Sequence, residues 1–94
     1  MAKKGELKDV DAHEQRIREN AIKHSAVLYR PRFPVRQDFD TFDEAMNFIS
    51  TGMRDSSEYR SALIYAIGEL ERTALVGTMD RNLNWKPVVP KRFK

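Results

Sequence analysis

The sequence contains no cysteine. This absence excludes disulfide frameworks, zinc sites built from thiolates and cysteine nucleophiles. A small domain without disulfides suits a reducing compartment, so we expect the protein in the cytoplasm. No stretch approaches the roughly 18 apolar residues that span a bilayer, and the charged N-terminus is not followed by the apolar run of a secretory signal. We therefore expect no membrane interaction.

Glycine and histidine are also scarce, with four and two residues respectively. The glycines are isolated, so no glycine-rich loop is present that could cradle a phosphate. The histidines, His13 and His24, would lie roughly 16 Å apart along one helix, which is too far for a shared metal or a shared catalytic role. No G-x-S-x-G nucleophile pattern occurs. The sequence therefore predicts no catalytic residue, no enzyme and no bound cofactor.

The one carboxylate cluster does not indicate a metal site. Asp38, Asp40, Asp43 and Glu44 lie close together but lack the D-x-D-x-D-G spacing and distal glutamate of a calcium loop. Helix capping accounts for the last three, because acidic side chains stabilise the positive end of a helix. We therefore predict no metal ligands.

Charge is abundant and unevenly distributed. Charged residues make up 33% of the 94 residues, and the net charge is +3. Residues 1–36 carry nine Lys/Arg against five Asp/Glu, residues 37–80 carry three against nine, and residues 81–94 carry five against none. The basic ends either neutralise the acidic middle within one fold or form a patch for a polyanion.

The periodicity of apolar residues predicts a mainly α, three-helix domain. Helix 1 is expected over about 11–24, helix 2 over about 42–51 and helix 3 over about 56–75. Helix 2 begins with a Thr41–Glu44 capping box and is expected to stop at Gly52. One stripe, which includes Leu63, would run along helix 3. The stripe comprises Tyr59, Ala62, Leu63, Ala66, Ile67, Leu70 and Ala74.

Two segments rich in proline flank these helices. Residues about 26–36 favour a short extended or β segment that the prolines interrupt. Residues 81–94 form a basic, extended C-terminal tail with apolar side chains, part of which we expect to pack. The expected organisation is therefore a flexible basic N-terminus (1–8), a single helical domain (9–80) and a basic arm with proline and aromatic residues (81–94).

Several side chains fit a surface for partners better than a core. Phe48 and Tyr65 point away from the predicted apolar stripes, and the arginines of 30–36 alternate with apolar residues. The tail combines cations with aromatic rings, which suits an acidic surface or a phosphate backbone. The predicted partner-binding residues are Phe48, Tyr65, Arg30, Arg32, Arg36, Trp85, Lys86, Lys91, Arg92 and Phe93.

These observations indicate a small non-enzymatic interaction protein that binds a larger macromolecular partner, as a regulator, inhibitor or assembly accessory. The short, site-free organisation is typical of small accessory proteins, including those of phages. The predicted partner is a protein. The alternative is a nucleic-acid-binding protein that uses the basic N- and C-terminal segments. Off-stripe residues such as Phe48, Ile64, Tyr65 and Leu75 also predict association of the chain with itself as a homo-oligomer.

Overall fold

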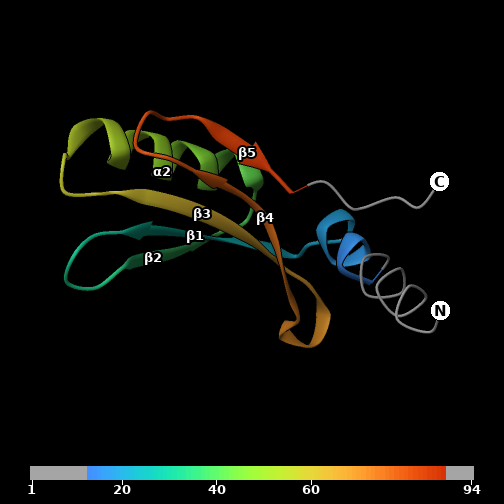
Figure 1. Cartoon of the computed structure of the whole chain (residues 1–94). Helices are drawn as coiled ribbons and strands as arrows, with labels where there is room; N and C mark the ends of the chain where they lie inside the picture. Colours follow the sequence, from blue (N-terminus) through green and yellow to red (C-terminus); the bar gives the residue numbers. More distant parts are fainter. Residues whose placement is uncertain (1–12, 89–94) are drawn as a thin grey trace, which may run out of the picture.

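The computed structural model describes residues 13–88 and shows a mixed α/β fold, so the prediction of a mainly α, three-helix domain is wrong. A five-stranded antiparallel sheet is combined with two helical segments (Figure 1). The first helical segment covers residues 13–19. The other elements are β1 (Lys23–Tyr29), β2 (Val35–Phe39), α2 (Phe42–Asp55), β3 (Ser61–Ile67), the short 3-10 turn η1 (Glu69–Glu71), β4 (Thr73–Met79) and β5 (Trp85–Pro87).

The strand order across the sheet is β2-β1-β3-β4-β5, and every neighbouring pair is antiparallel. β1 and β2 form a hairpin, and β3, β4 and β5 form a meander. α2 joins these two halves, since it leads the chain from the outer strand β2 past β1 to β3. β2 and β5 are therefore the edges of the sheet.

α2 is the element that the sequence predicted best. Thr41 caps the helix, because its hydroxyl accepts a hydrogen bond from the Glu44 amide while the Glu44 carboxylate accepts one from the Thr41 amide. The helix continues beyond Gly52 to Asp55, so the predicted stop at Gly52 is wrong. A Cβ at position 52 would lie 2.6 Å from Leu28 Cδ1, so glycine here lets the helix approach β1 closely.

The main core lies between α2 and the sheet. α2 contributes its buried face, and alternate residues of the central strands point toward it. Half-buried side chains, including Phe42 and Trp85, close its margin. Its fully buried members are Ala26, Leu28, Ala45, Ile49, Met53, Ala62, Ile64 and Met79.

The predicted helix over 56–75 is absent, because this segment forms β3, a tight turn and the first three residues of β4. The apolar run from Ala62 to Ile67 is long enough to show a helical stripe, but both of its alternating faces are apolar. A continuous run of this length is compatible with a central strand as well as with a buried helix. This segment forms a strand because it pairs with β1 on one side and with β4 on the other.

The turn between β3 and β4 explains why this hairpin was not predicted from the sequence. Leu70 and Glu71 adopt left-handed backbone conformations, with φ of 59° and 57°. The Arg72 amide donates to the Glu69 carbonyl at 3.3 Å, which closes a four-residue turn. Two central residues with positive φ usually call for Asn-Gly. Here leucine and glutamate occupy them, so no turn signal is visible in the sequence.

The predicted helix over 11–24 is confirmed only for residues 13–19, since β1 begins at Lys23 and contains His24. Residues 11 and 12 lie outside the described part of the chain. The helical segment lies against the same face of the sheet as α2, because a Cβ on Gly68, which continues the alternation of β3, would contact Ile17 at 3.4 Å. Arg18 Nε also donates to the Leu75 carbonyl at 2.8 Å.

The segment predicted to be extended over 26–36 contains most of β1, the proline-containing loop and the start of β2. Its extended character is confirmed, but its bounds are wrong, since β1 begins at Lys23 and β2 continues to Phe39. The expectation that part of the tail packs is also confirmed as far as Val88. Trp85 packs edge-on against Phe42, with ring centroids 5.8 Å apart. The Arg81 guanidinium donates to the carbonyls of Met53, Ser56 and Tyr59, which ties the tail to the end of α2.

His24 provides a testable pH dependence. Its ring packs against Phe42 with centroids 5.9 Å apart, and its buried Nδ1 has no hydrogen-bond partner in the described structure. Burial lowers the pKa of His24 below its ordinary value of 6.5. The unfolded chain therefore binds this proton more readily than the folded one, so stability should fall as the pH drops below about 6.5. Urea unfolding between about pH 8 and pH 5 should show a smaller loss in His24→Gln than in the native chain. Equal losses in the two proteins would assign the pH dependence to other groups.

Candidate protein-binding groove

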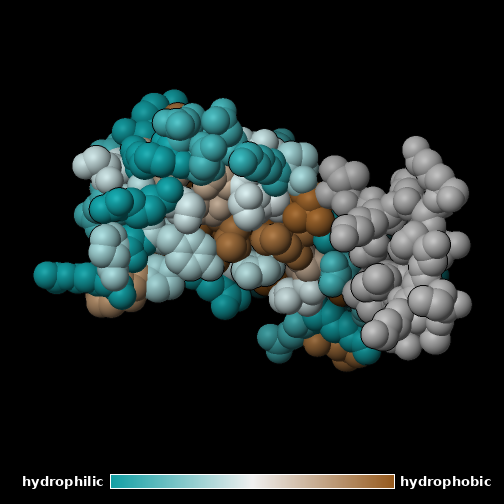
Figure 2. All heavy atoms as spheres, viewed as in Figure 1, coloured by the Kyte–Doolittle hydropathy of each residue, from teal (hydrophilic) through white to brown (hydrophobic). Residues whose placement is uncertain are grey.

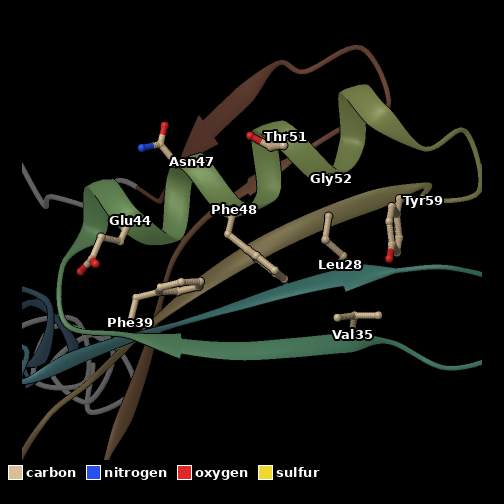
Figure 3. A pocket seen from close by; sticks show the side chains of 9 residues that line it. All are labelled: Leu28, Val35, Phe39, Glu44, Asn47, Phe48, Thr51, Gly52 and Tyr59. Atoms are coloured by element: carbon tan, nitrogen blue, oxygen red, sulfur yellow. The ribbon is translucent and has the colours of Figure 1, made fainter.

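A groove lies between α2 and the edge strand β2 (Figure 3). Its volume is about 580 Å³. Val35 and Phe39 point into it from β2, and Phe48 points into it from α2. The rings of Phe39 and Phe48 lie 5.3 Å apart, so they form an aromatic wall at one end. The remaining lining residues are Leu28, Glu44, Asn47, Thr51, Gly52 and Tyr59.

Two features of the sequence produce this groove. β2 alternates so that Val35, Gln37 and Phe39 share the face that α2 covers, because they pair with Leu28, Ala26 and His24 of β1. α2 packs most closely on β1, at the Gly52–Leu28 contact. The outer strand is therefore only partly covered, and its apolar side chains remain half-buried.

The groove carries opposite charges at its two ends. Glu44 lines the end nearest the start of α2. At the other end, the Arg30 guanidinium lies 5.8 Å from the centre of the Tyr59 ring and forms an ion pair of 3.1 Å with Glu58. Arg32 lies beside Arg30 around a second, smaller hollow. An elongated ligand in the groove would therefore meet a cationic end and an anionic end.

The predicted partner-binding residues divide between two surfaces. Phe48 lines the groove, and Arg30 and Arg32 lie near one end of it. Arg36 and Tyr65 lie on the opposite face of the sheet, because they share a face with Val27 and Ser25, which alternate with the α2-facing residues of β1. The structure therefore does not bring these five residues together into one site.

The predicted residues of the tail have different environments. Trp85 packs against the core, whereas Lys86 is exposed on β5. Hydrogen bonds from Asn84 lower the pKa of the Asp80 carboxyl, and the nearby charge of Lys86 contributes to this shift, so Lys86 already has an acidic neighbour. Lys91, Arg92 and Phe93 lie outside the described residues.

Sequence reasoning missed the apolar residues that make the groove, chiefly Val35, Phe39 and Tyr59. Val35 and Phe39 lie four residues apart on β2, so an extended chain places both on the same face. This even spacing was the signal that the sequence offered. Tyr59 was instead assigned to the apolar stripe of a helix that does not exist.

Two further features were sought in the part of the chain that the structure describes, a metal-binding cluster and a membrane-spanning helix. Residues 13–88 contain no group of three His, Asp or Glu side chains placed to hold a metal ion. No helix within this range combines the length and the hydropathy needed to cross a membrane. Comparison with known protein families, curated proteins and solved structures gave no match.

Proposed function

We propose that the protein is a non-enzymatic interaction module that binds an extended segment of a partner protein alongside β2. The observation that supports this proposal is the position of an apolar groove directly beside an edge strand. An edge strand offers unpaired amide and carbonyl groups to a further strand, and pockets beside it accept every second side chain of that strand. The groove and β2 together provide both parts of this binding mode.

The lining of the groove indicates the chemistry of the segment. Alternate apolar side chains would enter between Phe48 and the β2 residues Val35 and Phe39. An acidic residue would be favoured at the end near Arg30 and Arg32, and a basic residue near Glu44. Binding of a partner segment by strand addition is compatible with a role as a regulator, an inhibitor or an assembly accessory. All three roles therefore remain within this proposal.

Selection from a random peptide library against the immobilised full-length chain tests the proposal. The selected peptides should share apolar residues at alternate positions, and hydrogen exchange in Val35–Phe39 should slow when a synthetic copy binds. In calorimetric titrations, Phe48→Ala should weaken binding about tenfold or more, because it removes one wall of the groove.

Two further variants separate the loss of a contact from the loss of the fold. Thr51 is exposed and lines the groove, so Thr51→Lys should block the peptide without altering the core. Arg54 is exposed on the same helix but does not line the groove, so Arg54→Ala should leave affinity within about twofold. The proposal fails if no peptide is selected, or if the selected peptides bind Phe48→Ala and Thr51→Lys as tightly as the native chain.

A further inference from the structure

The sheet face opposite α2 has no covering layer in the described structure. Both helical segments lie on the other face, as the Gly52–Leu28 and Ile17–Gly68 contacts show. Apolar side chains nevertheless point outward from the central strands, since β3 places Leu63, Tyr65 and Ile67 on this side. These three residues are half-buried, and Ser25 and Val27 of β1 on the same face are buried, whereas the neighbours of the β3 residues on the α2 side are fully buried. A sheet that is apolar on both faces normally has a layer on each.

The strand register arranges the centre of this open face in two rows that cross the sheet, because directly paired residues point to the same side. Across one row, apolar and hydroxyl side chains lie between two cations. The other row begins with an acid and contains Tyr65 near its centre. The first row is Arg36, Val27, Leu63, Thr78 and Lys86, and the second is Asp38, Ser25, Tyr65 and Leu75. Shorter rows flank them, with Lys23, Ile67 and Thr73 on one side and Tyr29 and Ser61 on the other.

The composition of the open face is that of a protein interface, with an apolar centre and a charged margin. In Figure 2 hydrophobic side chains form a band over the middle of the molecule, in the region where Figure 1 shows the strands. Leu63 and Tyr65, at the centre of the two rows, are the side chains that a partner would cover first.

The charged margin contains both signs. Arg36 Nε donates to Ser25 Oγ at 2.7 Å and lies 3.5 Å from an Asp38 carboxylate oxygen, and both charged side chains remain about half exposed. Lys86 stands at the opposite edge of the face, and the exposed Lys23 adds a third cation where β1 begins. A polyanion would be repelled by Asp38, and a polycation by Arg36 and Lys86. A surface that carries the same pattern would match it, because each Asp38 could face a cation of the other molecule.

We propose that a second copy of this chain covers the open face, so that the two sheets pack face to face across a two-fold axis. Leu63, Tyr65 and Leu75 of each copy would form the centre of this interface, with Asp38 paired against Arg36 or Lys86 of the other copy. Five strands of seven residues or fewer give a flat footprint of about 500 Å². A standard stable interface covers about 800 Å² per partner, so the dimer should exchange with monomer at accessible concentrations.

Sedimentation velocity of the full-length chain between about 10 µM and 1 mM tests this proposal. The native chain should shift from monomer toward dimer over this range. Leu63→Glu should remain monomeric throughout, because it places a charge at the apolar centre. Asp38→Lys should weaken association about tenfold, since every charge left at that part of the margin is positive. Asp55→Lys makes the same change of charge at an exposed position on α2 and should associate like the native chain.

Circular dichroism melting identifies any variant that fails to fold, and Asp38→Lys, which changes an exposed side chain, keeps the test independent of Leu63. Amide shifts that change with concentration should map to Leu63, Tyr65 and Leu75. A native chain that stays monomeric to about 1 mM overturns the proposal. Shifts that map to α2 instead of the central strands also overturn it. Peptide binding in the groove should be unaffected by Leu63→Glu, so this proposal and the proposed function can fail separately.

Discussion

Replacing Ile64 with alanine is expected to destabilise the protein by about 2–5 kcal/mol, the range found for large-to-small changes in a closed core. Ile64 is completely buried at the centre of β3. Its partners on the neighbouring strands are Ala26 and Gly77, so small residues flank it on both sides. These neighbours cannot fill the space that the lost atoms leave. Urea unfolding monitored by circular dichroism measures the change.

The matched control is Leu63→Ala, one residue earlier on the same strand. Leu63 belongs to the open face and is half-buried, so its truncation should cost about 1 kcal/mol in dilute solution where the chain is monomeric. The predicted helix placed Leu63 in the core and Ile64 outside the main apolar stripe. In strand β3, by contrast, Ile64 lies in the core and Leu63 lies on the open face. Equal losses for the two variants would contradict the alternation of β3.

Gly77→Ala is expected to cost about 1–3 kcal/mol or more, because the added methyl group has no space. A Cβ at this position would overlap the Trp85 ring and lie 2.8 Å from the Lys86 carbonyl oxygen. Gly77 pairs with Pro87, so the clash should push β5 away from β4. Trp85 is the single tryptophan, so its fluorescence emission should shift to the red as the ring becomes exposed.

Gly68→Ala serves as the comparison for this effect. The nearest atom to a Cβ at position 68 would be Ile17 Cγ2 at 3.4 Å, an ordinary contact. The free energy of unfolding of Gly68→Ala should differ from that of the native chain by less than about 0.5 kcal/mol, and its Trp85 emission maximum should be unchanged. A native emission maximum in Gly77→Ala would show that β5 accommodates the methyl group without moving.

Local signals were sufficient for some elements and misleading for others. The capping box at Thr41 and Glu44 identified the start of α2, because both halves of that motif lie within four residues. The hairpin of β3 and β4 depends on a turn through Leu70 and Glu71, residues that give no turn signal. Its strand character depends on β1, which lies more than 30 residues earlier in the chain. Periodicity within one segment cannot include that partner.

The candidate groove was only partly accessible to sequence reasoning. Phe48 was identified because it lies off the main stripe of its helix, and that argument needs α2 alone. Val35 and Phe39 become groove residues only when β2 is known to be an edge strand. Arg36 and Tyr65 were grouped with Phe48 by composition, but the pleat of the sheet sends them to the other face.

The pairing of β1 with β3 at the centre of the sheet has a consequence for how the chain folds. This ladder joins residues that lie 32 to 44 positions apart, from Tyr29 with Ser61 to Lys23 with Ile67. The entropy of closing that long loop is lost before the central contacts form. Folding should therefore occur in milliseconds to seconds, rather than on the microsecond scale of a three-helix bundle. Until β3 arrives, the inner edge of the β1–β2 hairpin is open to other chains, so rapid refolding at high concentration favours aggregation.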